Sequence, residues 1–356
     1  MSAPVLSPQG QAPQLETVRN WKTPIIYGLF ALIALVVFAI GAPDEIATFD
    51  LSTGRDLVQL PPVHIPAAPV GWVISLIMIA IAVYSYLLTK SGRKQGRWMP
   101  TVYAAAFIIG FLVWVVGSAN ITSVSLAGLL AGSVTLAVPL IFGSLSGVLS
   151  ERVGVINIAI EGQLLAGAFA AAVAASISGN VYVGMLAAAF AGVLVSIVLA
   201  VFSIKYLVNQ IIVGVVLNVL VSGLTGFLFS TVLSSDPQTW NSPGSLPVIN
   251  IPLLSQIPII GSILFRQTLV GYLMYAAVII IYIGLFHTKW GLRVRAVGEH
   301  PQAADTVGIK VNFTRARNVL LGGAVAGLGG SFFTLVSVSQ FTKDMTAGLG
   351  YIALAA

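Results

Sequence analysis

Charged side chains and cysteine are what this sequence most lacks. Only 8% of the 356 residues are charged, whereas a soluble domain carries about 25%, so a soluble fold of this size would lack the charge to cover its surface. Cysteine is absent, which excludes a disulfide framework and a thiolate metal site. His64, His287 and His300 all fall in connecting segments, so we expect no buried histidine metal site. Lipid is therefore the expected main solvent of the chain.

Catalytic motifs are missing as well. The sequence has no phosphate loop of the form Gly-x-x-x-x-Gly-Lys-Ser/Thr. The apolar runs contain no paired carboxylates, metal cluster or activated nucleophile. We therefore expect no catalytic residue, metal or cofactor, and predict that the chain is not an enzyme.

Long apolar runs are what the sequence has in abundance. A membrane helix needs about 20 mostly apolar residues, and nine stretches qualify, so we predict an all-α, polytopic transmembrane helix bundle of about nine to ten spans, some of them broken. A tenth run opens at Gly348 and is still apolar at Ala356, so we expect the natural chain to continue. The nine stretches are 24–40, 70–88, 99–117, 126–149, 155–177, 181–204, 211–233, 269–286 and 319–338.

The predicted organisation has three parts. Residues 1–22, rich in proline, read as a disordered cytoplasmic tail; residues 23–120 form an N-terminal region of three spans; residues 121–356 form the core. The first apolar run could instead be a cleaved secretory signal, but its polar leader and its own length exceed those of a signal.

The basic residues predict the orientation of the chain. With the N-terminus in the cytoplasm, 14 of the 17 Lys and Arg residues fall on the inside and only Arg55, Arg266 and Lys343 fall outside, as the positive-inside rule requires. This pattern accounts for the net charge of +6 by membrane topology, so no nucleic-acid partner is expected. We predict a multi-pass protein of the bacterial inner membrane.

Glu161 is the one charge well inside an apolar run. An ionisable residue in a span costs about 2.5–3.5 kcal/mol or more and points to function. We predict that Asn157 and Glu161 form an i, i+4 pair on one helix face. Glu161 could be a strut that bonds the backbone of a broken helix, a substrate contact or a proton-coupling group. A faint echo between residues 154–160 and 348–354 fits broken helices that meet at a substrate site.

A polar stripe marks the seventh span. Asn218, Ser222 and Thr225 recur at i, i+4 and i+7. Such a stripe can line a hydrated path for a polar solute, or it can hold helices together through hydrogen bonds between them. We name these three residues, with Asn157 and Glu161, as the candidate substrate pathway.

The loop from His287 to Asn318 predicts a short helix at the cytoplasmic face. Pro301 suits the first position of a helix and Gly308 suits its C-terminal cap. Between them, Ala303 and Ala304 offer small apolar contacts that a cytoplasmic motor could grip. On spacing alone the segment could also be an ordinary basic loop.

At this loop the sequence resembles the permease subunits of ABC importers for nucleosides and simple sugars, the branched-chain amino acid and ribose type of inner-membrane translocator. The resemblance covers residues 123–356 and rests on four segments in order: 150–162, 291–309, 322–330 and 346–355. One departure is Gly348-Leu349-Gly350, where similar permeases commonly carry a basic residue between the glycines.

The resemblance implies a transport function and a set of partners. Two permease chains, identical or homologous, would form the pore; a cytoplasmic ATP-binding subunit would drive it; and an extracytoplasmic solute-binding protein would deliver the solute, for which the outer loop 234–267 is a candidate dock. The segment of Asn157 and Glu161 resembles the pore-proximal element. The coupling loop that docks on the ATPase is implied at Arg295, Glu299, Pro301, Ala303, Ala304, Asp305 and Gly308.

Nucleosides are the first expected substrate and simple sugars the second. The alternative is an ion-coupled secondary transporter of a small polar solute. Such carriers use acidic or histidine relays inside the bundle, and Glu161 is the one candidate for such a relay.

Overall fold

A computed structural model describes residues 20–54, 56–119 and 123–356 of the chain. In these residues nine helices are long and apolar enough to cross a membrane, so the prediction of an all-α polytopic bundle is confirmed. Most of the predicted tail, residues 1–19, lies outside the described residues. The candidate spans are Lys22–Ile40, Ala67–Lys90, Trp98–Ser118, Leu126–Glu151, Ile160–Ser178, Val181–Lys205, Gln210–Leu233, Leu269–His287 and Val311–Ser337.

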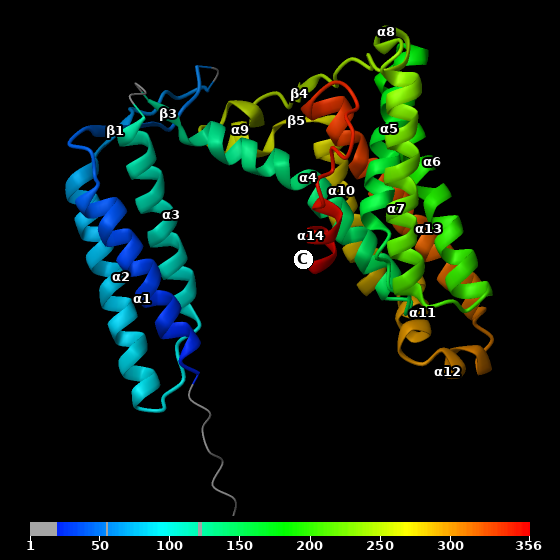
Figure 1. Cartoon of the computed structure of the whole chain (residues 1–356), viewed down its shortest axis with the longest axis horizontal. Helices are drawn as coiled ribbons and strands as arrows, with labels where there is room; N and C mark the ends of the chain where they lie inside the picture. Colours follow the sequence, from blue (N-terminus) through cyan, green and yellow to red (C-terminus); the bar gives the residue numbers. More distant parts are fainter. Residues whose placement is uncertain (1–19, 55, 120–122) are drawn as a thin grey trace, which may run out of the picture. The chain divides into compact units, whose positions relative to one another are not determined.

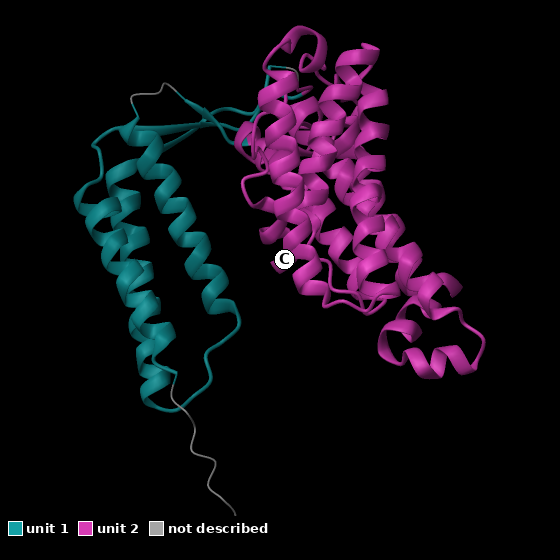
Figure 2. Ribbon diagram, turned by 45° about the vertical axis from the view of Figure 1, so that its right-hand side comes forward, with its two compact units in different colours: residues 1–54, 58–126 teal, residues 55–57, 127–356 magenta. Residues whose placement is uncertain are grey.

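The chain folds as two compact units (Figure 2). Unit 1 comprises residues 1–54 and 58–126, and unit 2 comprises residues 55–57 and 127–356. Each has its own hydrophobic core.

Unit 1 is a three-helix bundle with a small sheet at one end (Figure 1). Its helices are α1 (Lys22–Ala34, continued by π-helical turns Leu35–Ile40), α2 (Ala67–Lys90) and α3 (Trp98–Ser118). Strand β1 (Ile46–Asp50) pairs antiparallel with β2 (Val63–Pro66) and parallel with β3 (Val124–Ser125). Large side chains such as Phe38, Met78 and Met99 fill the core between the helices.

Unit 2 carries the remaining elements, with α8 at one end and α12 at the other (Figure 1). Two short strands, β4 and β5, pair antiparallel. In chain order the elements are α4 (Leu126–Glu151), α5 (Ile160–Ser178), α6 (Val181–Ala200), α7 (Gln210–Leu228), α8 (Pro237–Trp240), β4 (Val248–Asn250), α9 (Ile260–Leu264), β5 (Arg266–Thr268), α10 (Leu269–His287), α11 (Lys289–Glu299), α12 (Pro301–Thr306), α13 (Val311–Phe332) and α14 (Leu349–Ala355).

Glycines bring α5, α6 and α13 into backbone contact. A Cβ atom on Gly327 of α13 would lie 2.2 Å from the carbonyl oxygen of Ala188, and one on Gly192 of α6 would lie 2.0 Å from that of Gly323. On α5, a Cβ on Gly167 would lie 2.3 Å from the carbonyl oxygen of Gly327. Small residues allow such close approach in membranes, where helix association depends on packing.

Two span boundaries differ from the prediction by five residues or more. The last long helix begins at Val311, eight residues before the predicted Val319, because charged residues near a membrane surface do not end a helix. The fifth span begins at Ile160 instead of Val155, because the chain makes a non-helical connection there.

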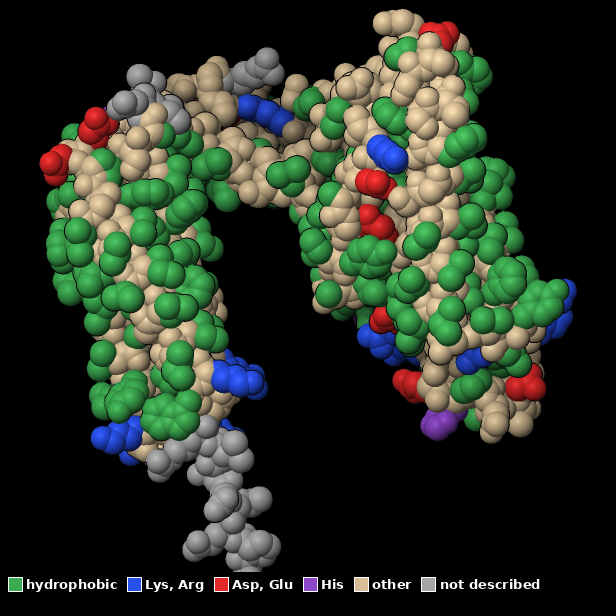
Figure 3. Space-filling view, viewed as in Figure 1, with side chains coloured by type: hydrophobic (Ala, Val, Ile, Leu, Met, Phe, Trp, Pro, Cys, Tyr) green, Lys and Arg blue, Asp and Glu red, His purple; other side chains and the backbone are tan. Residues whose placement is uncertain are grey.

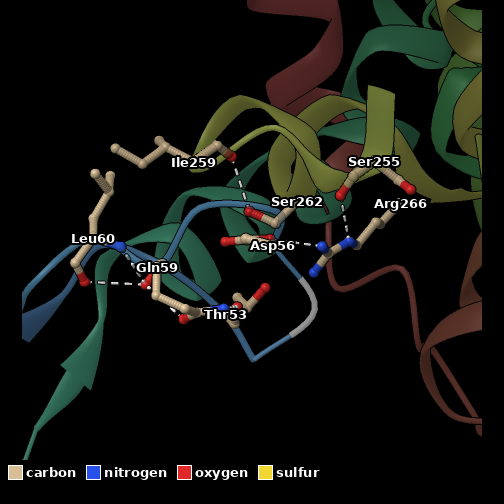
Figure 4. Close-up of polar contacts among 9 residues, drawn as sticks. Thr53, Asp56, Gln59, Leu60, Ser255, Ile259, Ser262 and Arg266 are labelled. Atoms are coloured by element: carbon tan, nitrogen blue, oxygen red, sulfur yellow. Dashed lines mark hydrogen bonds and ion pairs between the residues drawn. The ribbon is translucent and has the colours of Figure 1, made fainter. Parts of the chain in front are cut away.

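A buried ion pair lies at the β4–β5 end of unit 2 (Figure 4). The Arg266 guanidinium donates to Asp56 at 2.7 Å, and its Nε donates to the carbonyl oxygen of Ser255 at 2.9 Å. The side chains are 13% and 0% exposed for Arg266 and Asp56. Removing one partner of such a pair leaves a buried charge uncompensated.

Candidate functional site

The connection between α4 and α5 is the first part of the site. It turns at Gly154, whose φ of +77° is a left-handed conformation that favours glycine, and residues 155–159 are not helical. Asn157 therefore lies outside the helix that carries Glu161. The predicted i, i+4 pair on one helix face is wrong, because residues related by that spacing share a face only when the turn between them is helical.

Glu161, in the first turn of α5, holds the start of α14. Its Oε1 accepts hydrogen bonds from the Thr346 hydroxyl (2.6 Å) and the Gly348 amide (2.9 Å), and its Oε2 accepts from the Gly350 amide (2.6 Å). A Cβ on Gly350 would lie 2.5 Å from the Glu161 backbone, so only glycine allows this approach. A carboxylate at a helix N-terminus satisfies amides that have no partner within the helix. These contacts fit the interpretation of Glu161 as a strut that bonds the backbone of a broken helix.

Asn157 belongs to a different, fully buried polar network. Its Nδ2 donates to the Ser146 hydroxyl of α4 (3.2 Å) and to Gln163 Oε1 of α5 (3.1 Å). Gln163 Nε2 in turn donates to the Ser196 hydroxyl of α6 (2.9 Å). All four side chains are 0% exposed. The network fastens the connection to three helices, as satisfied buried polar groups do.

The polar stripe of α7 divides between two roles. Asn218 bonds the start of α5: its Oδ1 accepts from the Gly162 amide (2.8 Å) and its Nδ2 donates to the Ile158 carbonyl (2.9 Å). The Ser222 hydroxyl donates to Asp344 Oδ1 (2.6 Å). Thr225 donates to the Val221 carbonyl of its own helix (2.7 Å) and is 3% exposed. It therefore bonds neither the start of α5 nor Asp344.

A cavity of about 540 Å³ opens between α5, α7 and the segment before α14. Three of the five candidate pathway residues line it: Glu161, Asn218 and Ser222. Asn157 and Thr225 do not. The other lining residues are Gly162, Leu165, Val219, Gly223, Asp344, Ala347, Gly348 and Tyr351.

Sequence reasoning missed Asp344 and Tyr351. Asp344 adds a second carboxylate to the cavity, and Tyr351 adds an aromatic ring whose hydroxyl lies 3.2 Å from Asn218 Nδ2. Asp344 (φ +53°), Ala347 (φ +48°) and Gly348 (φ +81°) are all left-handed. Left-handed residues other than glycine are costly and gather at functional sites. The signal in the sequence that could have revealed this part of the site is the charged pair Lys343-Asp344, shortly before Gly348-Leu349-Gly350.

The loop that follows α10 forms two helices. Pro301 begins α12 and Gly308 follows it with φ +83°, so the predicted short helix and its cap are confirmed. The helix α11 was not predicted; it contains Arg295 and ends at Glu299. Ala304 is buried, whereas Ala303, Asp305 and Glu299 are exposed on this end of unit 2.

Helix α11 packs on the turn that precedes the Glu161 segment. A Cβ on Gly298 would lie 2.3 Å from the Arg152 carbonyl oxygen. Arg152 and Arg295 both lie over the Phe286 ring, at 5.5 and 5.6 Å from its centroid, a favourable cation–π arrangement. From α13, Arg315 Nε donates to the Val153 carbonyl (3.2 Å). The loop of α11 and α12 and the cavity are thus joined through residues 152–161.

Comparison with known protein families identifies the class of protein. Residues 129–356 match the family described as branched-chain amino acid transport system / permease component. The match covers more than half of the chain, and the chain belongs to this family. It is a membrane-embedded, multi-pass ABC transporter permease, as the resemblance predicted.

Relatives of known name agree with this assignment. The chain is 38% identical over 225 residues to the nucleoside ABC transporter permease protein NupC of Lactococcus lactis, which is 61% of this chain and 70% of that one. It is 37% identical over 229 residues to the guanosine ABC transporter permease protein NupQ of Bacillus subtilis, covering 62% and 71%. The glucose ABC transporter permease protein TsgB13 of Haloferax volcanii is 32% identical over 227 residues, covering 61% and 60%. No solved structure matches the chain.

Proposed function

We propose that this chain is the permease subunit of an ATP-driven nucleoside importer, with simple sugars as the second candidate substrate. Two relatives are named for nucleoside or guanosine transport and one for glucose. The observation that carries the proposal is the cavity lined by Glu161, Asn218, Ser222, Asp344 and Tyr351. It combines hydrogen-bond acceptors, an amide and a hydroxyl with an aromatic ring, which suits a ribose and a planar base.

The proposed orientation places the N-terminus and α12 in the cytoplasm. Basic side chains gather around α11 and α12 in unit 2 (Figure 3), and at the end of unit 1 away from its strands. Both gatherings agree with the positive-inside rule. A partner ATP-binding subunit would dock on α12, a solute-binding protein on the opposite end around α8, and a second permease chain would complete the pore. No nucleic acid takes part.

Alternating access would proceed through the 152–161 segment. Movement of α11 and α12 on ATP binding would push on the Arg152 carbonyl through Gly298. The connection would carry this displacement to Glu161, which holds α14 by three hydrogen bonds, and so change the cavity wall. The chain itself would hydrolyse no ATP. A discontinuous helix at a transport site can move in this way because its end is held by a few polar contacts.

Uptake of radiolabelled nucleosides tests the substrate and the cavity together. Gly223 lines the cavity, and a Cβ there meets no atom within 4 Å. We expect Gly223→Phe to fill the cavity and abolish guanosine uptake by the assembled transporter, while Gly132→Phe, also in open space but not in the cavity lining, leaves uptake unchanged. Normal uptake by Gly223→Phe would contradict the proposed path.

The energy source is tested separately. Dissipating the proton gradient at constant ATP should leave uptake by proteoliposomes unchanged, and the purified chain alone should release no phosphate from ATP. Uptake that follows the proton gradient would instead support the secondary-transporter alternative, in which Glu161 would be the coupling group.

A further inference from the structure

A second cavity, of about 450 Å³, lies between α11 and the first turns of α13. It is separate from the transport cavity, with which it shares no lining residue. Three cationic side chains line it: Arg293, Lys310 and Arg317. No carboxylate lines it, and in the part of the chain that the structure describes none of the three forms an ion pair. The cavity is therefore suited to an anion.

Two of the lining residues each carry a buried polar atom that has no hydrogen-bond partner among the described residues. Asn318 is 0% exposed, and its Oδ1 has no hydrogen-bond partner among the described residues, although its Nδ2 donates to the Thr314 carbonyl (2.8 Å). The buried indole Nε1 of Trp290 also has no partner there. Buried polar atoms are nearly always paired, so the polar groups at this end of unit 2 are incompletely satisfied by the described residues.

The cavity lies beside the ends of two candidate membrane spans. Trp290 follows the end of the α10 span at His287 by three residues, and Asn318 lies two turns into the α13 span, about 10 Å along the helix at 1.5 Å per residue. Tryptophan and basic side chains favour the membrane–water interface. Beside the cations, Phe313 and Val307 are 66% and 75% exposed and offer apolar contact for the glycerol and upper acyl region of a lipid.

We propose that this cavity binds the headgroup of an anionic phospholipid, with phosphate between the three cations. Basic pockets between spans on the cytoplasmic side hold such headgroups. The competing occupant is an acidic surface of the ATPase subunit, but the exposed apolar side chains of Phe313 and Val307 beside the cations favour a lipid. This inference goes beyond the proposed transport function and needs only that this end of unit 2 lies at a bilayer surface.

Native mass spectrometry of the purified full chain tests it directly. The chain in neutral detergent is titrated with phosphatidylglycerol, with phosphatidylethanolamine, and with inorganic phosphate as competitor. We expect Arg293→Gln/Lys310→Gln/Arg317→Gln to weaken phosphatidylglycerol binding about tenfold or more, given the attraction of each basic group to anionic lipid. The matched control, Lys90→Gln/Arg93→Gln/Lys94→Gln, removes the same charge from the α2–α3 loop and should weaken it less than about twofold.

Each outcome decides the proposal. The lipid-site proposal is supported if the preference for phosphatidylglycerol persists in the control and in Arg293→Lys/Arg317→Lys and is lost in the triple Gln variant. Equal binding of both lipids, equal loss in both triple variants, or displacement of lipid by millimolar phosphate overturns it. Unchanged lipid binding with loss of the ATPase subunit on co-purification assigns the cavity to the partner instead. Because binding is measured without transport, failure here leaves the importer proposal standing, and loss of nucleoside uptake leaves the lipid site standing.

Discussion

Both units contain apolar helices long enough to cross a membrane, but the helices pack against one another differently within the two units. In unit 1 large side chains fill most of the space between the helices, with a close backbone contact at Gly71, where a Cβ would lie 1.7 Å from the Phe38 carbonyl oxygen. Its buried Ser75 donates to the backbone carbonyl of Ala34 (2.9 Å). In unit 2 glycines on three helices, α5, α6 and α13, place the backbones in contact, and the buried amides of Asn157 and Gln163 bond one another and the hydroxyls of Ser146 and Ser196.

The difference shows where precision is needed. Contacts through bulky side chains tolerate small shifts, because side chains can repack. Backbone contact through glycine, with a satisfied polar network, leaves few alternative arrangements. Unit 2 therefore has the features expected of the part that holds a cavity and a discontinuous helix in one geometry, and its perturbation should cost more.

The largest effect is expected at the α6–α13 contact. Gly327→Leu forces side-chain atoms into the Ala188 carbonyl, and overpacking of this kind costs about 3 kcal/mol or more, so folded protein should be nearly lost. Gly28→Leu in unit 1, where a Cβ meets no atom within 4 Å, should give normal yield. Monodisperse yield by fluorescence-detected gel filtration measures both, and equal loss would contradict the importance of the α6–α13 backbone contact.

Next in size is the carboxylate that holds α14. Glu161→Leu leaves the Gly348 and Gly350 amides unpaired, at about 1–3 kcal/mol each, so uptake should fall more than about tenfold. Glu161→Gln, which keeps the shape but weakens the bonds, should lower it a few-fold. The exposed acid Glu151 supplies the control, since Glu151→Gln should transport normally. Uptake by proteoliposomes is the measurement, and full activity of Glu161→Leu would refute the strut role.

An intermediate effect is expected between the coupling loop and the cavity. Gly298→Ala places a Cβ 2.3 Å from the Arg152 carbonyl and should displace α11. We expect the assembled transporter to keep hydrolysing ATP while nucleosides carried per ATP fall several-fold. The solvent-facing substitution Gln302→Ala, on α12, should not change this ratio unless α12 docking itself is lost, which co-purification of the ATPase reports.

The smallest effect compares one buried hydrogen-bonding group from each unit. Gln163→Leu removes several bonds at once and leaves the Ser196 hydroxyl unpaired, which should destabilise the protein by about 2–3 kcal/mol. Ser75→Ala in unit 1 removes a single bond and should cost about 1 kcal/mol. Thermal unfolding in detergent ranks the two, and a larger loss for Ser75→Ala would contradict the proposed difference.

Membrane class, number of spans, the short helix after Pro301 and the permease family were all predictable from the sequence. Each depends on properties that neighbouring residues share: apolar runs long enough to cross a bilayer, proline and glycine at helix ends, and motifs read in chain order. The sequence also singled out Glu161, because a charge in an apolar run is rare and costly.

Tertiary structure alone decided what those residues touch. Whether Asn157 shares a helix face with Glu161 depends on the turn at Gly154, and the partners of Glu161 at Gly348 and Gly350 lie about 190 residues further along the chain. Asp344 and Tyr351 became cavity residues only because α14 packs against α5. Local sequence determines which segments become helices. Contacts between residues distant in sequence depend on how the backbones pack, and the hydrophobic periodicity of a segment does not encode that packing.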